Sequence, residues 1–189
     1  NPDNQLVTDK VWHELAFGLE SLGYSNSVIK RRVAEMASYF GIQTWFRKSV
    51  SELSGGQKQL LNLASVMAMQ PEVLILDEPA SQLDPIAARD FLSTVHRLNR
   101  ELGVTIVISE HRLEEIFPLA DRAIVMDEGR IIANARPSEV AIQLAGNGDD
   151  ESVHPMYYGM PPGMKLFPKD LVRWQDSLPM PLREGRILM

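Results

Sequence analysis

Two carboxylates directly follow a short apolar run near the middle of the chain. The run is Val73–Leu76, and Asp77 and Glu78 come next, before Pro79. A continuous apolar run is typical of a strand buried on both faces of a parallel sheet, and proline ends such a strand. Open α/β sheets bind ligands at the carboxyl ends of their strands. Carboxylates at such an edge point to nucleotide phosphates and magnesium, while a solvated strand end is the alternative interpretation.

A serine and two glycines open the amphipathic segment that precedes this strand. Ser54 is followed by Gly55, Gly56 and Gln57, and the periodic segment runs from Gln57 to Met69. Ser54 can cap this helix, and the glycines let backbone N–H groups approach an anion at the helix N-terminus. An ordinary serine-capped helix with a flexible entry is the alternative.

A histidine follows the next predicted strand. The β-branched segment Val104–Ile108 is typical of a strand, and His111 lies just beyond its carboxyl end. If this strand is parallel to Val73–Leu76, His111 could point at the same ligand edge. A lone histidine is more often structural, so only its position makes it a candidate.

The chain divides into a helical part and an α/β part. Helical spacing predicts one helix from Thr8 or Asp9 to Gly23 and another from Ser25 or Asn26 to Gly41. Pro85 is placed for the first turn of a helix that runs to about Leu102. The later predicted elements are a short helix at 113–119, strands at 122–126 and 130–133 joined by a turn at 128–129, and a helix that starts at 137–139.

Composition narrows the class of protein. The chain has 189 residues, 44% of them hydrophobic, a formal net charge of −6 and no cysteine. The acidic balance argues against nucleic-acid binding, and the absence of cysteine excludes disulfides and cysteine-ligated metals. No apolar run reaches the length of a membrane span. Because the first residue is Asn1 and not Met, the chain is expected to be a fragment of something longer.

These motifs together resemble the ATPase domain of the ATP-binding cassette (ABC) family. Leu53–Gln57 matches the family's signature motif, Val73–Pro79 its Walker B strand with the following glutamate, Ser81–Asp84 its D-loop, and His111 its switch histidine. The resemblance covers about residues 1–145, and four motifs in this order are far more specific than any one.

Within the family, the chain is most similar to the energy-coupling factor ATPases of vitamin and metal-ion importers. Asn1–Leu6 resembles the segment that follows their Q-loop glutamine, and Glu110–Glu115 also resembles that branch. The tail resembles the connection between two fused ATPase domains in tandem members.

The resemblance implies an α/β fold, a partial P-loop NTPase core with parallel strands, an all-helical signature subdomain and an irregular C-terminal tail. The implied domains are a helical and signature subdomain at 1–70, an α/β core portion at 71–145, and a linker or tail at 146–189, possibly toward a second cassette.

The resemblance also implies a role for each candidate residue. Glu78 would be the general base, and His111 would bind the γ-phosphate and the transition-state charge. Asp77 would support Mg²⁺, and Asp84 would couple the two half-sites of a cassette pair. The γ-phosphate of ATP held by an opposing cassette would be contacted by Ser54, Gly55, Gly56 and Gln57. His13, His96 and His154 are assigned no role.

One motif is missing from the sequence. No Gly-x-x-x-x-Gly-Lys-Ser/Thr phosphate loop occurs, and in the family this loop lies upstream of the Q-loop. These residues alone are therefore expected to bind ATP weakly and not to hydrolyse it at a useful rate. Loss of the family's central Walker A strand would also expose apolar edge around Val73–Leu76.

The resulting hypothesis is a partial ATPase subunit of an ABC-type importer for a vitamin or metal ion, with ATP and Mg²⁺ as cofactors. Its partners would be a second cassette, separate or fused, and a transmembrane subunit that docks on residues 8–52. It would lie in the cytoplasm, peripherally on the inner face of the cell membrane. The alternatives are a soluble cassette ATPase of DNA repair, chromosome organisation or translation, and a non-hydrolysing regulatory cassette.

Overall fold

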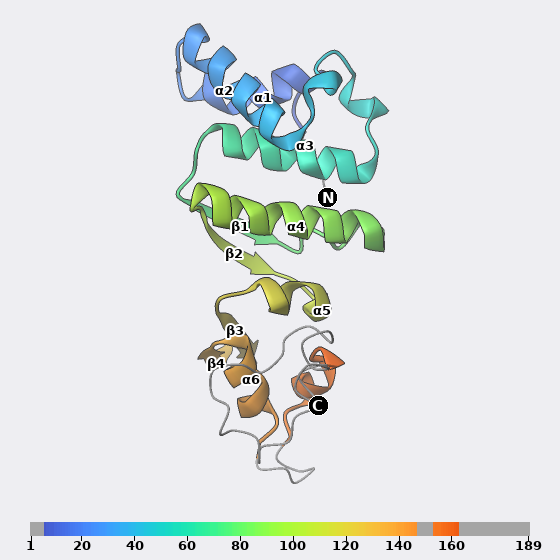
Figure 1. The fold of residues 1–189 in the computed structure, drawn as a ribbon, viewed down its shortest axis with the longest axis vertical. Coiled ribbons are helices and arrows are strands. Elements are labelled where there is room, and N and C mark those ends of the chain that lie inside the picture. The colour runs from blue at the N-terminus through green and yellow to red at the C-terminus, as the bar shows by residue number, and fades with distance from the viewer. Residues whose placement is uncertain (1–5, 147–152, 163–189) are drawn as a thin grey trace. The chain divides into compact units, whose positions relative to one another are not determined.

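The chain forms two compact units. The computed structural model describes residues 6–146 and 153–162 (Figure 1). The first unit runs to Glu110, and the second begins at His111. The predicted domain boundaries at 70/71 and 145/146 are sequence-based and stay a prediction. No helix in the described ranges is long and apolar enough to span a membrane.

Three helices form the N-terminal part of the first unit. They are α1 (Val11–Ser21), α2 (Asn26–Phe40) and α3 (Gly55–Ala68). The short 3₁₀ helices η2 (Gln43–Trp45) and η3 (Val50–Glu52) connect α2 to α3. The helical prediction for this part is therefore confirmed. The fully buried side chains that hold it together include Leu15, Leu19, Ile42 and Leu61.

The ends of these helices show which local signals were decisive. Gly41 ends α2 in the left-handed region with φ 68°, as its glycine predicts. The N-cap of α1 is Lys10 and not Thr8 or Asp9. Thr8 instead donates its N–H and its hydroxyl to the buried carboxylate of Glu14, at 2.8 and 2.9 Å. The carboxylate of Glu14 thus accepts hydrogen bonds from the segment that precedes α1. Thr8 is engaged in these bonds and does not cap the helix, so the prediction of Thr8 or Asp9 as N-cap is wrong.

A parallel β–α–β element completes the first unit. Strand β1 (Val73–Asp77) pairs in parallel with β2 (Thr105–Ser109), and Asp77 lies opposite Ser109. Helix α4 (Pro85–Leu102) connects them, with Pro85 in its first turn as predicted. Equal strand lengths in register bring both carboxyl ends to one edge of the sheet.

The expectation that β1 is buried on both faces is wrong for this structure. Leu74 is buried, but Val73 and Ile75 are 54% and 75% exposed, and Val107 on β2 is 52% exposed. Within the described residues this sheet has two strands. Alternate side chains of a strand point to opposite faces, so one apolar row meets solvent.

The second unit is built on a hairpin and a helix. Strands β3 (Ala123–Asp127) and β4 (Arg130–Ala135) pair antiparallel, with an irregularity between Val125 and Met126. Glu128 and Gly129 both have positive φ, 45° and 75°, as a tight two-residue hairpin turn requires. The other elements are α5 (Leu113–Ile116), η4 (Phe117–Leu119), α6 (Pro137–Leu144) and η6 (Pro155–Gly159). Their shared core contains Phe117, Ala133, Val140, Ala141, Leu144 and Met160.

Candidate functional site

The first candidate region is the strand edge at the end of β1. The hydroxyl of Ser109 donates to Oδ1 of Asp77 at 2.6 Å, which is a short hydrogen bond to a charged acceptor. Asp77 itself is exposed. One carboxylate oxygen is therefore oriented by the neighbouring strand while the group still faces solvent, as a site for a hydrated cation requires.

Glu78 is held in an unusual backbone conformation at the same edge. Its φ is 44°, in the left-handed region that non-glycine residues seldom occupy. Its N–H lies 3.0 Å from the carbonyl oxygen and 3.1 Å from the hydroxyl oxygen of Ser109. The hydroxyl of Ser81 donates to the carbonyl of Glu78 at 2.9 Å. Such strain costs on the order of 1–3 kcal/mol and persists where surrounding contacts enforce it, often at functional sites.

Two residues at the end of β2 were not predicted to act in the site. Besides Ser109, Glu110 accepts the N–H of Ala80 at 2.8 Å through Oε1. Both hold the Asp77–Ser81 turn from a position about thirty residues further along the chain. The available signal was that Asp77 and Ser109 each directly follow an apolar run, so a parallel pairing with aligned carboxyl ends places Ser109 opposite Asp77.

The second candidate region is the N-terminus of α3. Ser54 is its N-cap, as predicted, and its hydroxyl accepts the N–H of Gln57 at 3.3 Å. The side-chain oxygen of Gln57 in turn accepts the N–H of Ser54 at 3.0 Å, which completes a capping box. The helix begins at Gly55 and not at Gln57, so both glycines lie inside its first turn.

The two glycines have different surroundings. A Cβ atom on Gly55 would meet no atom within 4 Å, whereas one on Gly56 would lie 3.2 Å from Cβ of Ala87 in α4. Gly56 therefore allows α3 and α4 to approach closely. Gly55 leaves open space beside the capped helix N-terminus.

This approach brings Asp84 next to the signature residues. Asp84 is the N-cap of α4, and its Oδ1 accepts the N–H groups of Ile86 and Ala87 at 3.0 Å each. Because Gly56 packs against Ala87, the N-termini of α3 and α4 lie side by side, with a capping side chain on each. The carboxylate of Asp84 already occupies the N-terminus of α4, so the N-terminus of α3 beside Gly55 is the one that favours a further anion.

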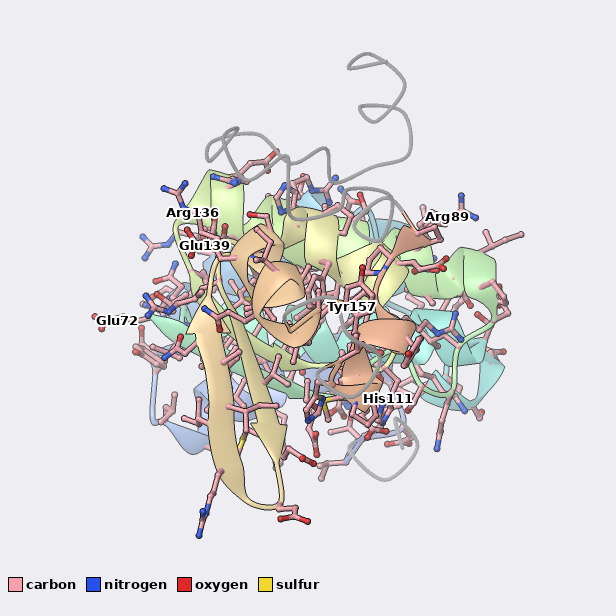
Figure 2. All side chains as sticks on the ribbon, turned by 90° about the horizontal axis from the view of Figure 1, so that it is seen from below. Glu72, Arg89, His111, Arg136, Glu139 and Tyr157 are labelled. Carbon is pink, nitrogen blue, oxygen red and sulfur yellow. The ribbon has the colours of Figure 1, made fainter. Side chains whose placement is uncertain are left out.

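His111 is the first residue of the second unit, and it is exposed (Figure 2). Its carbonyl accepts the N–H of Leu113 at 3.0 Å. Its placement at the edge of β1 and β2 stays a prediction from the order of the motifs.

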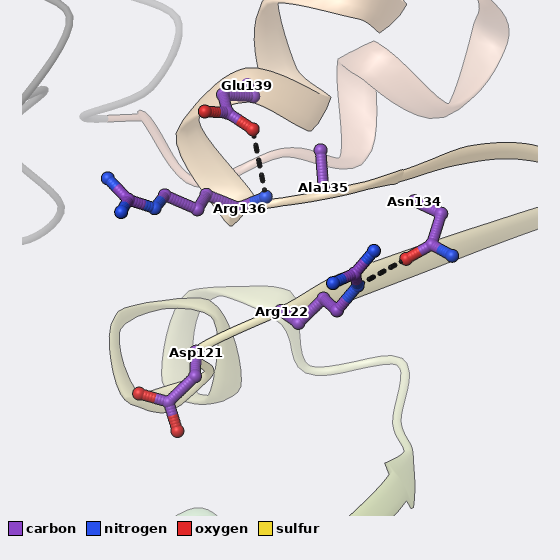
Figure 3. Close-up of a pocket in the computed structure, with 6 residues that line it drawn as sticks. All are labelled: Asp121, Arg122, Asn134, Ala135, Arg136 and Glu139. Atoms are coloured by element: carbon purple, nitrogen blue, oxygen red, sulfur yellow. Dashed lines mark hydrogen bonds between the residues drawn. The ribbon is translucent and has the colours of Figure 1, made fainter.

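A pocket of about 490 Å³ in the second unit is lined mainly by charged and amide residues (Figure 3). Nε of Arg122 donates to Oδ1 of Asn134 at 2.6 Å, and the N–H of Arg136 donates to Glu139 at 3.3 Å. Asp121 and Ala135 complete the lining, which includes no predicted site residue.

The described residues could supply one ligand to a metal site whose other ligands are waters and phosphate oxygens, but not a complete set of protein ligands. No group of three or more His, Cys, Asp or Glu side chains in ranges 6–146 and 153–162 could hold a metal ion. The hard oxygens of Asp77 suit a Mg²⁺ ion that keeps waters and takes phosphate oxygens as further ligands.

Comparison with known proteins identifies the family. The family model described as "ABC transporter" matches residues 3–81, a range that contains both the signature residues and the Asp77–Glu78 pair. A putative ABC transporter ATP-binding protein of Bacillus cereus is 46% identical over 190 residues, covering 100% of this chain and 32% of that protein. The energy-coupling factor transporter ATP-binding protein EcfA1 of Caldanaerobacter subterraneus is 42% identical over 140 residues, covering 74% of this chain and 50% of that protein.

The fold agrees with this match. CbiO1 of Clostridium perfringens, part of the ABC transporter complex cbiONQ, superposes with a TM-score of 0.70 at 35% identity, covering 76% of this chain and 57% of CbiO1. The α/β fold is thus that of a partial P-loop NTPase cassette. The chain belongs to the family of ABC transporter ATP-binding domains, and within this family it is similar to EcfA1 and CbiO1. It spans about a third of the length of the Bacillus relative.

Proposed function

We propose that these residues form part of the ATP-hydrolysing subunit of an ABC importer, and that hydrolysis drives transport of a vitamin or metal ion. The observation that carries the proposal is the strand edge, where Ser109 orients Asp77 at 2.6 Å and enforces the strained backbone of Glu78. Similarity to EcfA1 and CbiO1 supports the choice of transporter branch.

The strand edge suggests a division of work between two carboxylates. Asp77, oriented by Ser109, would hold Mg²⁺ through its hydration shell. Bound Mg²⁺ would neutralise charge that develops on the phosphate oxygens. Glu78 would take a proton from the attacking water as general base, and its fixed backbone limits where its carboxylate can lie. His111 would bind the γ-phosphate in this scheme.

The helix N-termini suggest how a partner cassette takes part. Ser54, Gly55, Gly56 and Gln57 would contact the γ-phosphate of ATP held by a second cassette, and the open space beside Gly55 supports an approach from outside. Asp84, which caps the adjacent helix, would couple the two half-sites of the pair.

The helical part suggests a membrane partner. Residues 8–52 would dock a transmembrane subunit and so hold the protein at the cytoplasmic face of the membrane. Several large apolar side chains of this part are exposed, as expected at a protein contact: Trp12, Phe17, Leu22 and Tyr24.

The test is ATP turnover by the full-length protein, wild type against Glu78→Gln, with and without membrane partners. Loss of a general base is expected to lower turnover by about 100-fold or more. Wild-type turnover that rises with the partners would support a transporter motor. Turnover that is the same with and without the membrane partners would favour a soluble cassette ATPase. Absence of turnover in every form of the protein would favour a non-hydrolysing regulatory cassette.

A further inference from the structure

The segment Val153–Pro162, here called the strap, is held on the second unit at two points. The N–H of His154 donates to the carbonyl of Leu144, at the end of α6, at 2.9 Å. Nε2 of His154 lies 3.4 Å from Oδ2 of Asp127 at the end of β3. The strap falls in the predicted linker, and its first described residues contact both α6 and the hairpin.

The strap also completes the core of the second unit. Met160 is 2% exposed and belongs to the buried cluster with Phe117, Val140 and Leu144. By contrast, Met156, four residues earlier in the same segment, is 41% exposed. A buried methionine in the strap therefore fills space that the rest of the unit leaves, and an exposed one provides a matched control.

The same core reaches His111 through α5. Leu113, the first residue of α5, packs against the cluster, and a Cβ atom on Gly159 would lie 3.9 Å from Cδ1 of Leu113. Leu113 donates its N–H to the carbonyl of His111 at 3.0 Å. Arg112 between them has φ −84° and ψ 68°, the values of an inverse γ-turn. This tight turn leaves little freedom between the backbones of Leu113 and His111.

We propose that the strap positions His111. Gly159 and Met160 fix Leu113 and the core beneath α5, and the γ-turn passes that placement to the histidine. Tyr157 of the strap packs against the same core as Leu113. The consequence for catalysis rests on the proposed function, in which His111 binds the γ-phosphate. Gly159 and Met160 would then be positioning residues.

The first test needs no activity. Imidazole resonances of His111 in the 189-residue chain are recorded by NMR and assigned with His111→Gln. Met160→Ala should shift or broaden them, Met160→Leu should restore them, and the exposed control Met156→Ala should leave them unchanged. Unchanged His111 resonances in Met160→Ala would overturn the proposal.

A second variant keeps the test decisive if Met160→Ala fails to fold. Gly159→Val keeps the core methionine and pushes a larger side chain toward Leu113. It should move the same resonances, and a folded Gly159→Val chain with wild-type His111 signals would overturn the proposal.

The catalytic consequence is measured in the full-length protein. Met160→Ala should lower kcat/KM for ATP several-fold, because a displaced His111 would contact the γ-phosphate and its transition-state charge less well, and Met160→Leu should restore it. An equal loss in Met156→Ala would overturn the positioning role. If the wild-type protein shows no turnover, the proposed function fails, and the NMR result alone decides whether the strap positions His111.

Discussion

The two candidate regions of the first unit are held in place in opposite ways. At the N-terminus of α3, Ser54 and Gln57 form reciprocal side-chain to backbone hydrogen bonds within four residues of the chain. At the end of β1, Asp77 and Glu78 depend on Ser109, which lies 32 and 31 residues further along. The first region is a relaxed local cap, and the second is a strained turn maintained by long-range contacts. A binding contact needs only a stable helix end, whereas a general base needs a fixed direction.

Removing the long-range contact should have the larger effect on activity. Ser109→Ala deletes the hydroxyl bound to Asp77 and Glu78, and a hydrogen bond to a charged group contributes about 1.5–3 kcal/mol. Turnover by the full-length protein should fall by about tenfold or more, with most of the loss in kcat. Ser81→Ala is a useful companion because it removes a bond to the same turn without touching Asp77. Equal turnover in Ser109→Ala and wild type would show that the strand edge needs no support.

Removing the local cap should lower stability, in addition to any loss of the proposed contact to ATP held by a second cassette. Ser54→Ala loses the N-cap of α3, which costs about 1 kcal/mol in the free energy of unfolding. Urea unfolding of the chain should show a lower midpoint with an unchanged slope. Ser54→Asp retains a capping oxygen and should keep the midpoint. A midpoint unaffected by Ser54→Ala would contradict the capping role seen in the structure.

A long-range contact outside both candidate regions serves as a control, because it links residues far apart in the sequence but has no proposed role in catalysis. The hydroxyl of Tyr39 on α2 donates to Glu101 on α4 at 2.8 Å, and the guanidinium of Arg97 lies 5.0 Å from the ring centroid. Partial burial, followed by the bond to Glu101, raises the pKa of Tyr39 above its ordinary value of 10.0. Tyr39→Phe should leave turnover almost unchanged, unlike Ser109→Ala.

The raised pKa also predicts a small pH effect. Between pH 10.0 and the raised value, the folded chain keeps the Tyr39 proton that the unfolded chain has lost. The free energy of unfolding should therefore fall as pH rises through that window, with the contribution fully present below pH 10.0. Tyr39→Phe should flatten this alkaline slope in unfolding measurements, and an identical slope in both proteins would contradict it.

The same contrast explains what the sequence could predict. The helices, the Ser54 cap and the Glu128–Gly129 turn depend on neighbours within a few residues, so their patterns sufficed. The Ser109–Asp77 contact required knowing that β1 and β2 are parallel and in register, which no local pattern states. Loss of a neighbouring strand predicted an exposed apolar edge around Val73–Leu76, but not the exposed face at Val73 and Ile75, since an apolar run predicts a strand and not the number of layers around it.

The strap shows a similar limit. Irregular composition after Gly146 predicted a linker, because the apolar residues there follow neither a helical nor a strand periodicity. Met160 fills a core built from α5, α6 and the hairpin, and such a fit depends on the shape of distant elements. The residues beyond Pro162 lie outside the described part of the chain.

The most direct measurement is the rate at which the full-length protein releases labelled ATP in a Glu78→Gln background. Blocking the general base should trap ATP between paired cassettes, so release should be slow. Adding Gly55→Val should restore fast release, because a Cβ atom at this position has open space and a larger side chain there would obstruct a ligand that approaches the N-terminus of α3. Slow release that persists with Gly55→Val, in a folded protein, would contradict the assignment of the α3 N-terminus to ATP bound by a partner cassette.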